Sequence, residues 1–144
     1  MTYRVLPRLQ VGVEYNPLSS DLSPLANATL LEETKRRPAL IAGTSSDRIG
    51  TPHGQSFYLT VSKDVERWTG LPLAPYAGVT YGTYQDRVRP IGGLLLRIRT
   101  GLSALVLFDG VHVHPTASYR WRDHAFSLIL VRGRDPGISY SVAF

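Results

Sequence analysis

The chain has 144 residues, which suits a single domain spanning 1–144, and 43% of them are hydrophobic, too many for a disordered chain. It has no cysteine, which excludes disulfides and thiolate metal sites, and no apolar run of about 18 residues, which excludes a transmembrane helix. The net charge is +5, but the arginines are scattered, which indicates solvated turns and inward charges rather than a nucleic-acid site.

Residues 3–15 predict the first strand. Tyr3, Val5, Pro7, Leu9, Val11, Val13 and Tyr15 lie on one face, and Arg4, Arg8 and Glu14 are among the residues on the other. The apolar face ends in tyrosine on both sides, and the opposite face carries three charges, more than a packed soluble core would accept. Its length suits a tilted membrane-crossing strand of roughly 9–11 residues. Pro7 fits a strand edge or a bulge.

The chain continues as strands separated by turns and loops. Residues 16–24 predict a loop, 26–33 a strand, Lys35-Arg36-Arg37 a tight turn and 38–45 a returning strand. After a loop over 47–54, strands are predicted over 56–66 and 74–84, with a turn at 69–72 between them. In the second of these, Ala77, Val79 and Tyr81 point outward. The inward Gly78 and Gly82 are small enough to let a narrow barrel close.

The second half repeats the pattern. A loop over 85–89 leads to strands over 91–99 and 102–109, joined by a turn at Thr100-Gly101. Strands follow over 111–121 and 124–132, joined at Arg122-Asp123, and a turn over 134–137 precedes the terminal strand. This makes ten strands and no convincing helix. The links after odd strands are longer than most links after even strands, as in outer-membrane barrels, and eight or twelve strands would keep that logic.

The terminal strand carries Ile138, Tyr140, Val142 and Phe144 on one face, and it resembles the closing strand of a bacterial outer-membrane β-barrel. The pattern of the whole chain is similar to that class. The resemblance implies an all-β fold: a closed, antiparallel, up-and-down transmembrane β-barrel of about ten strands. It also implies that the barrel-insertion machinery recognises the C-terminal strand. In lipid every backbone donor and acceptor must be paired, so a sheet without spanning helices has to close.

Four short phrases also resemble the barrel region of outer-membrane proteins linked to exopolysaccharide or capsule secretion. They are Val11-Gly-Val-Glu-Tyr-Asn-Pro17, Arg37-Pro-Ala-Leu-Ile-Ala-Gly43, Tyr58-Leu-Thr-Val-Ser-Lys63 and Leu107-Phe-Asp-Gly110. Those proteins are usually much longer, so the resemblance implies a piece or a minimal relative, and it transfers no catalytic residue. We expect a bacterial outer-membrane location, with the lipid bilayer, lipopolysaccharide and other envelope proteins as partners. No cofactor and no nucleic acid are expected. No signal peptide is visible, which implies a removed leader or a truncated chain.

Two sets of residues follow from this topology. The charged side chains expected to face the lumen are Arg4, Arg8, Glu14, Asp64, Glu66, Arg97, Arg99, Asp109, Arg120 and Arg132. The expected aromatic girdle consists of Tyr3, Tyr15, Tyr81, Tyr119, Trp121, Tyr140 and Phe144. The charges either form ion pairs that plug a narrow lumen or leave surplus arginine along an anion passage, and plugging is favoured. The predicted role is a structural scaffold or a narrow, anion-preferring channel.

Three alternatives remain open. His112 and His114 share a strand face and are candidate metal ligands, but spacing supplies no third ligand; His124 would qualify only at the same end of the barrel. Asp47, His53, Asp109 and His112 lie in or near the longer loops and are candidates for a rim-active hydrolase, although no enzyme is the favoured expectation. The third alternative is a soluble all-β module that binds an anionic polymer, polysaccharide or nucleic acid, through arginine.

Overall fold

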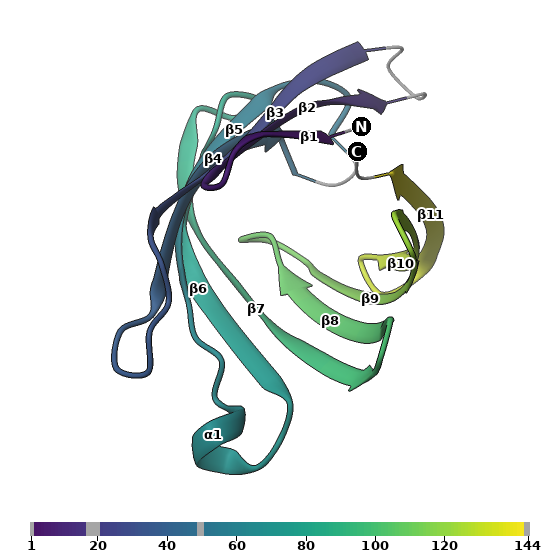
Figure 1. The fold of residues 1–144 in the computed structure, drawn as a ribbon. Helices are drawn as coiled ribbons and strands as arrows, with labels where there is room; N and C mark the ends of the chain where they lie inside the picture. Colours follow the sequence, from purple (N-terminus) through teal and green to yellow (C-terminus); the bar gives the residue numbers. More distant parts are fainter. Residues whose placement is uncertain (1, 17–20, 49–50, 143–144) are drawn as a thin grey trace.

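A computed structural model describes residues 2–16, 21–48 and 51–142, without the side chains of residues 2, 4, 16, 21, 141 and 142. The fold is all-β: eleven antiparallel strands form one sheet in up-and-down order, β1 to β11 (Figure 1). The strands are β1 (Thr2–Leu6), β2 (Leu9–Asn16), β3 (Asp21–Leu31), β4 (Ala39–Ser46), β5 (Gln55–Ser62), β6 (Leu73–Gly82), β7 (Arg87–Arg99), β8 (Leu102–Phe108), β9 (Val113–Trp121), β10 (His124–Val131) and β11 (Asp135–Val142). A short helix, α1 (Glu66–Thr69), lies between β5 and β6.

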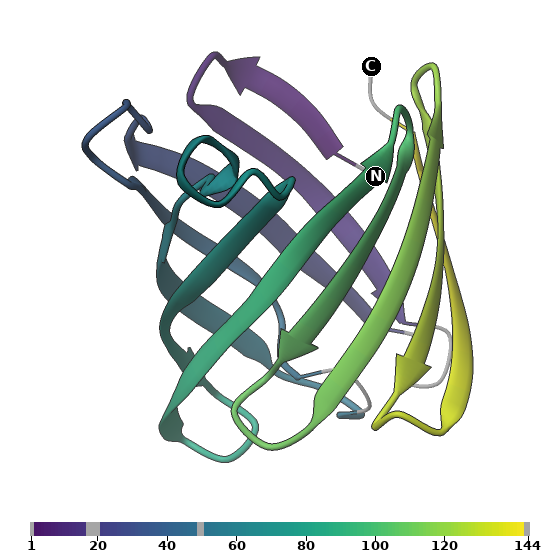
Figure 2. The ribbon, with the colours of Figure 1, turned by 90° about the horizontal axis from the view of Figure 1, so that it is seen from below.

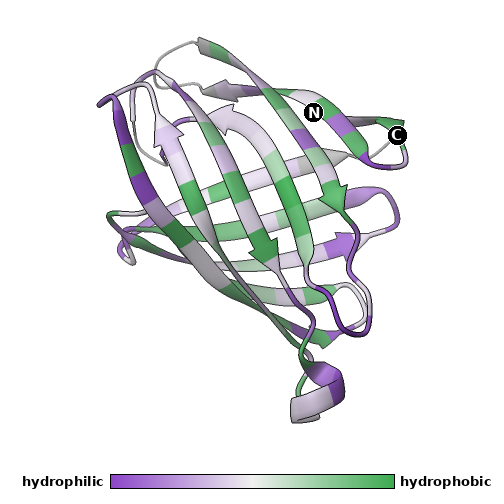
Figure 3. Cartoon of the chain, turned by 90° about the vertical axis from the view of Figure 1, so that its left-hand side faces the viewer, coloured by the Kyte–Doolittle hydropathy of each residue, from purple (hydrophilic) through white to green (hydrophobic). Residues whose placement is uncertain are grey.

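The curved sheet has an inner and an outer face. Hydrogen bonds that pass over an intervening strand identify the concave side, which we call the inner face. Glu14 of β2 accepts from the Ser46 amide and hydroxyl of β4 at 3.0 and 2.9 Å, and Tyr58 of β5 donates to Asn27 of β3. Because side chains alternate along a strand, Leu59, the neighbour of Tyr58, lies on the outer face. Figure 3 shows the resulting alternation of hydrophobic and hydrophilic residues along the strands.

The sheet is not closed, since no pairing joins β1 to β11 within the described residues. Figure 1 shows the sheet curling round until its two edge strands face one another across an opening. Eleven is an odd number, so β1 and β11 run in the same direction. β1 is short, and its pairing with β2 ends where Thr2 meets Gly12. The up-and-down antiparallel sheet of the prediction is therefore shown, and its closure into a barrel is not.

The links between strands gather at two ends of the sheet (Figure 2). The helix end holds links 32–38, 63–72 with α1, 100–101 and 122–123. The distal end holds 83–86, 109–112, 132–134 and the described residues of 47–54. Tight turns were expected at the helix end and longer loops at the distal end. Links 100–101 and 122–123 are tight as expected, and the link before β6 was the expected exception. The expectation fails at link 32–38, which is longer than the predicted turn, and at 132–134, which is a tight turn at the distal end.

The predicted first strand, 3–15, is two strands, which raises the count from ten to eleven. The chain reverses at Pro7 and Arg8, so that Leu6 of β1 pairs with Leu9 of β2. Proline has no amide hydrogen to donate and its fixed φ suits a turn. The turn is held from the next strand, since the Thr29 amide donates to the Arg8 carbonyl at 2.8 Å. Both halves keep the same apolar face, because Tyr3 pairs with Val11.

Other boundaries also differ from the prediction. β3 begins at Asp21 and β7 at Arg87, inside segments whose Pro, Ser, Asp and Gln content predicted loops. β5 ends at Ser62, after which α1 forms between Val65 and a left-handed Gly70 (φ 69°). β9 starts at Val113, two positions late, because the Asp109 carboxylate binds the amides of the intervening residues. α1 buries no residue, and no helix in the described part is long and apolar enough to cross a membrane.

Candidate functional site

Burial is inverted relative to a soluble globular protein. Among the described residues, the deeply buried polar or charged side chains are Ser23, Ser56, Thr80, Asp109 and His114, and the buried hydrophobic core is Ala39 alone. Large apolar side chains are instead exposed on the outer face of every strand from β5 to β11. Examples are Phe57, Leu59, Val79, Leu94, Val106, Val113, Phe126, Leu128 and Ile138. The outer face is therefore an apolar surface far larger than soluble monomers normally expose.

Five residues of the predicted aromatic girdle lie toward the two ends of the outer face. Tyr15 and Tyr81 lie toward the distal end, and Tyr119, Trp121 and Tyr140 lie toward the helix end, all exposed. Tyr3, also exposed, pairs with Val11 nearer the middle of β2, and Phe144 lies outside the described residues.

The helix-end aromatic group has polar tips. The His124 ring stacks on Tyr140 at 5.9 Å between centroids, and its Nδ1 is 2.7 Å from the Tyr140 hydroxyl. The Phe126 and Tyr140 centroids are 5.0 Å apart, and the Arg122 guanidinium lies 5.4 Å from the centre of Trp121. Rings that combine an apolar body with a polar tip suit a membrane–water interface.

Two tyrosines of the inner face cover glycines on neighbouring strands. Tyr58 pairs with Gly43, and a Cβ on that glycine would lie 2.5 Å from the Tyr58 ring. Tyr76 likewise pairs with Gly93, where a Cβ would lie 2.6 Å from ring atom Cε1. The rings lie across the sheet and fill space that larger side chains at the two glycines would need. Neither glycine was given a structural role by the sequence analysis, which singled out Gly78 and Gly82 instead.

The inner face is polar on one side and apolar on another. A cavity of about 350 Å³ lies against β3 to β8. Tyr58, Thr60, Tyr76 and Thr80 line it from β5 and β6, and Ile91 and Leu107 line it from β7 and β8.

Ion pairs cross the helix end. Arg97 of β7 contacts Asp64 at 2.7 Å and Glu66 at 2.9 Å, so it ties link 63–72 to the inner face. The Glu66 amide and the Arg97 guanidinium hold the pKa of Asp64 below its ordinary value. Lys63 contacts Glu33 at 3.1 Å, and Arg8 pairs with Glu32 at 2.8 Å in the adjoining turn.

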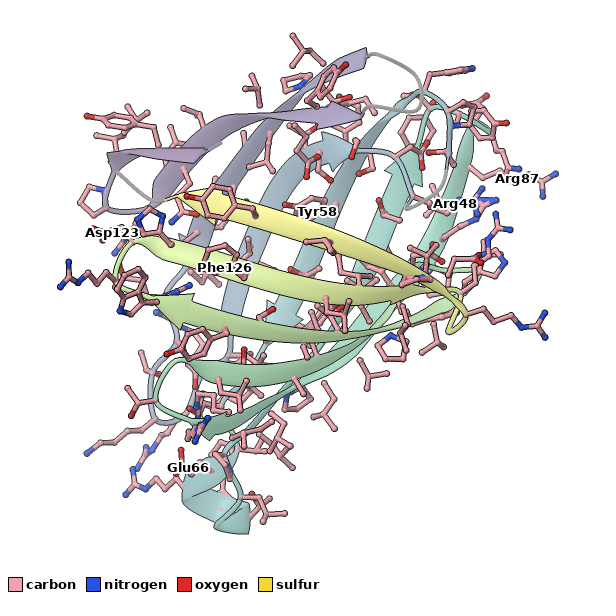
Figure 4. The ribbon with its side chains drawn as sticks, turned by 90° about the vertical axis from the view of Figure 1, so that its right-hand side faces the viewer. Arg48, Tyr58, Glu66, Arg87, Asp123 and Phe126 are labelled. Carbon is pink, nitrogen blue, oxygen red and sulfur yellow. The ribbon has the colours of Figure 1, made fainter. Side chains whose placement is uncertain are left out.

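Arg99 and Arg120 share a helix-end cavity with Arg97 and with the hydroxyls of Ser103 and Ser118. Figure 4 shows Glu66 and Asp123 toward this end of the molecule, and Arg48 and Arg87 toward the other.

A buried Asp–His pair lies at the distal end. His114 is 0% exposed, and its Nε2 is 2.9 Å from Asp109 Oδ2. The Arg132 amide donates to His114 Nδ1 at 3.2 Å. An amide can only donate, so in the neutral ring Nδ1 accepts and Nε2 carries the proton. The other Asp109 oxygen accepts from the amides of Val111 and His112 at 2.9 and 2.7 Å.

Asp109 stays ionised in this setting. Burial alone would raise the pKa of Asp109, but the amide of His112, the ring of His114 and the amide of Val111 outweigh burial and lower it. The pair links β8, β9 and the turn between β10 and β11. Both ring nitrogens of His114 are occupied by this network, so the ring offers no lone pair to a metal unless the network breaks.

The residues predicted for a rim hydrolase are held in separate contacts. Asp47 binds the Arg48 and Tyr84 amides at 2.7 and 2.9 Å, and the His53 ring packs against Tyr84 at 5.0 Å. Asp109 binds the ring of His114 rather than that of His112. In the described part of the chain no group of three His, Cys, Asp or Glu residues is placed to hold a metal, and His124 lies at the helix end, away from His112.

The predicted lumen charges are divided between the two ends. Arg97, Arg99 and Arg120 lie at the helix end with Asp64 and Glu66, and Asp109 and Arg132 lie at the distal end. Glu14 is on the inner face, Arg8 is in an exposed turn, and the side chain of Arg4 lies outside the described part. Comparisons with protein-family models, curated proteins and solved structures found no match to this chain.

Proposed function

We propose that the chain is a small transmembrane β-barrel of the bacterial outer membrane that acts as an envelope scaffold or a narrow pore. The inverted burial supports this most directly: the outer face is apolar and exposed, while the buried positions among the described residues are serine, threonine, aspartate and histidine, with Ala39 the one apolar exception. In water such a surface would drive aggregation, because removing apolar area from water is favourable by about 25 cal/mol for each Å². In a bilayer the same surface contacts hydrocarbon, and the aromatic groups near its two ends lie at the interfaces.

Closure of the sheet is part of this proposal. An open edge cannot remain in hydrocarbon, because unpaired backbone groups cost several kcal/mol each. The antiparallel route pairs β11 with β2, since these two strands run in opposite directions. It yields a barrel of ten strands, with β1 moved away from the edge of β2. β11 is then both the closing strand and the segment that the insertion machinery recognises.

The interior fits a plugged or narrow lumen better than a wide channel. Tyr58 and Tyr76 lie across the inner face, and Arg97 fastens link 63–72 at the helix end with two ion pairs. Any passage that remains has more arginine than acid, which favours anions. The same surfaces identify the partners: lipid and lipopolysaccharide outside, with envelope proteins at the link-bearing ends.

Folding in the presence and absence of detergent tests the membrane assignment. Circular dichroism of the purified, denatured chain diluted into buffer or into zwitterionic micelles should show β-structure only in micelles. Reconstitution into planar bilayers should then give small or no conductance steps. A folded, monomeric protein in plain buffer contradicts the proposal.

A matched pair of substitutions separates a lipid-facing from a water-facing outer surface. Leu128 is 51% exposed on the outer face of β10, and Ser127, its neighbour, lies on the inner face. Leu128→Arg should reduce stability in bilayers by about 2–4 kcal/mol, whereas Ser127→Arg should cost much less. The measurement is reversible urea unfolding in lipid vesicles. If Leu128→Arg is neutral, the outer face meets water.

The soluble alternative, an all-β module that binds an anionic polymer through arginine, makes the opposite prediction. It requires a detergent-free monomer whose binding to heparin or nucleic acid weakens with salt. A hydrolase at the distal rim would instead lose activity on substitution of His53, Asp109 or His112.

A further inference from the structure

Two arginines at the distal end are held together without a counter-charge. Arg48, in the link after β4, and Arg89, near the start of β7, both donate to the same side-chain oxygen, Gln85 Oε1; the Arg48 distance is 3.2 Å. Both arginines are half-buried. Neither forms an ion pair within the described residues, although like charges at such close range repel.

A third arginine completes the cluster. A cavity of about 380 Å³ is lined by Arg48, Arg89 and Arg132, together with Gln85, His112 and Tyr84. Its other lining residues are Thr51, Pro52 and Val111, so among the residues that the structure describes the lining contains no carboxylate. Four separate links and the start of β7 contribute to it.

Two acids of the adjoining links, Asp47 and Asp109, are committed to contacts within those links. Asp47 is engaged by the amides of Arg48 and Tyr84, and Asp109 by two amides and the buried His114 ring. Each carboxylate therefore stabilises its own link, while the guanidinium groups remain unneutralised. A neutral amide oxygen between two cations holds their positions without cancelling their charge.

We propose that this cavity, the distal arginine site, binds a phosphate group. Guanidinium groups recognise oxyanions through paired, charge-assisted hydrogen bonds. Donors that approach from several links suit a tetrahedral oxyanion, which offers more oxygens than a planar carboxylate. A dianionic phosphate would also relieve the repulsion between Arg48 and Arg89. The site does not require the sheet to close, so it stands apart from the membrane assignment.

Calorimetric titration of the folded chain with inorganic phosphate tests the proposal. Saturable binding is expected, and Arg48→Gln and Arg89→Gln should each weaken it about ten-fold or more, the usual effect of losing a charge-assisted hydrogen bond. Arg87→Gln is the matched control: it removes the same charge from the same strand, outside the cavity lining, and should change affinity by less than about two-fold. Absence of saturable binding to the wild-type chain, or equal weakening by Arg87→Gln, overturns the proposal.

Two further arms identify the source of the phosphate. Micelles doped with phosphatidic acid should bind more tightly than micelles doped with phosphatidylcholine if the ligand is a lipid headgroup, and inorganic phosphate should compete. Equal binding to both micelles, with free phosphate still bound, identifies a soluble phosphate compound. Circular dichroism of each sample shows whether the chain is folded. A failure to fold bears on the membrane assignment, whereas a folded chain that does not bind phosphate overturns the distal arginine site.

Discussion

At the scale of single residues, Asp109 organises the distal end. Its carboxylate accepts hydrogen bonds from two backbone amides and from the fully buried ring of His114. A buried carboxylate with such donors stabilises the folded state only while it is ionised. The pair explains why β9 begins after His112, and why Asp109, predicted as a lumen charge, is a structural residue of the link.

Asp109→Asn should destabilise the chain by about 1–3 kcal/mol, because the amide keeps one acceptor but loses the charge. The pKa of Asp109 is lower folded than unfolded, so its contribution is present above the unfolded value, about 3.9, and is lost as pH falls through the folded value. Urea unfolding at a series of pH values below about pH 4 should therefore show that acidification lowers the free energy of unfolding less in Asp109→Asn than in the wild type.

Asp123→Asn, in the exposed turn between β9 and β10, is the control for that experiment. It should leave both the neutral stability and the acid-dependent loss nearly unchanged. If the free energy of unfolding falls by the same amount below about pH 4 in Asp109→Asn and in the wild type, this carboxylate does not contribute as described.

At the scale of strands, the pairs of glycine and tyrosine set how closely neighbours pack on the inner face. Gly93→Ala places a methyl group against the Tyr76 ring and the Val106 carbonyl, so we expect a loss of about 1–3 kcal/mol. Gly92→Ala, next to it on the outer face, has one close neighbour, the Tyr76 carbonyl oxygen at 3.0 Å, and gains strand propensity, so it should cost less than Gly93→Ala. Urea unfolding of both variants is the measurement. Equal costs would mean that the Tyr76 ring and the Val106 carbonyl do not limit the space at Gly93.

Period-two alternation predicted the facing of strands well. Val79 and Tyr81 were assigned outward and Gly78 and Gly82 inward, and the described burial confirms that assignment. Strand ends were less predictable where a tertiary contact decides them. Pro7 suited a strand edge or a bulge, and the sequence could not show that Thr29 would bind the Arg8 carbonyl and hold a turn there.

The distal arginine site was beyond sequence reasoning for the same cause. Arg48, Gln85 and Arg132 are far apart in the chain, and only the order of the strands brings their links to one end. Of these, Arg132 was predicted to face the lumen, while Arg48 and Gln85 carried no signal. Asp109 was considered with Asp47, His53 and His112 as a hydrolase candidate, and the structure instead joins its carboxylate to the ring of His114.

At the scale of the whole molecule, the proposed narrow pore predicts that charge at the helix end sets the ion preference of any conductance that the barrel shows. Asp64 and Glu66 neutralise Arg97, which leaves Arg99 and Arg120 as the surplus. Replacing both acids, Asp64→Asn with Glu66→Gln, frees Arg97 and should shift the reversal potential in a salt gradient toward stronger anion preference. The exposed ion pairs add little to stability, so folding should survive. Asp123→Asn is the control, and an unchanged reversal potential would place Arg97 off the ion route.

Closure of the sheet can be tested by cross-linking, because the chain has no native cysteine. In the antiparallel route, outer-face residues of β2 meet outer-face residues of β11. Tyr15 lies beyond the part of β2 that pairs with β1. The variant Tyr15→Cys should therefore form a disulfide with a second cysteine that replaces Pro136, Ile138 or Tyr140. Cysteines that replace Gly137 or Ser139 should not react, because side chains at these positions point to the inner face. Oxidation in micelles, read as a mobility shift on gels, is the measurement. Reaction at none of the five partners would mean that β2 and β11 stay apart, and a barrel closed by these strands would be wrong.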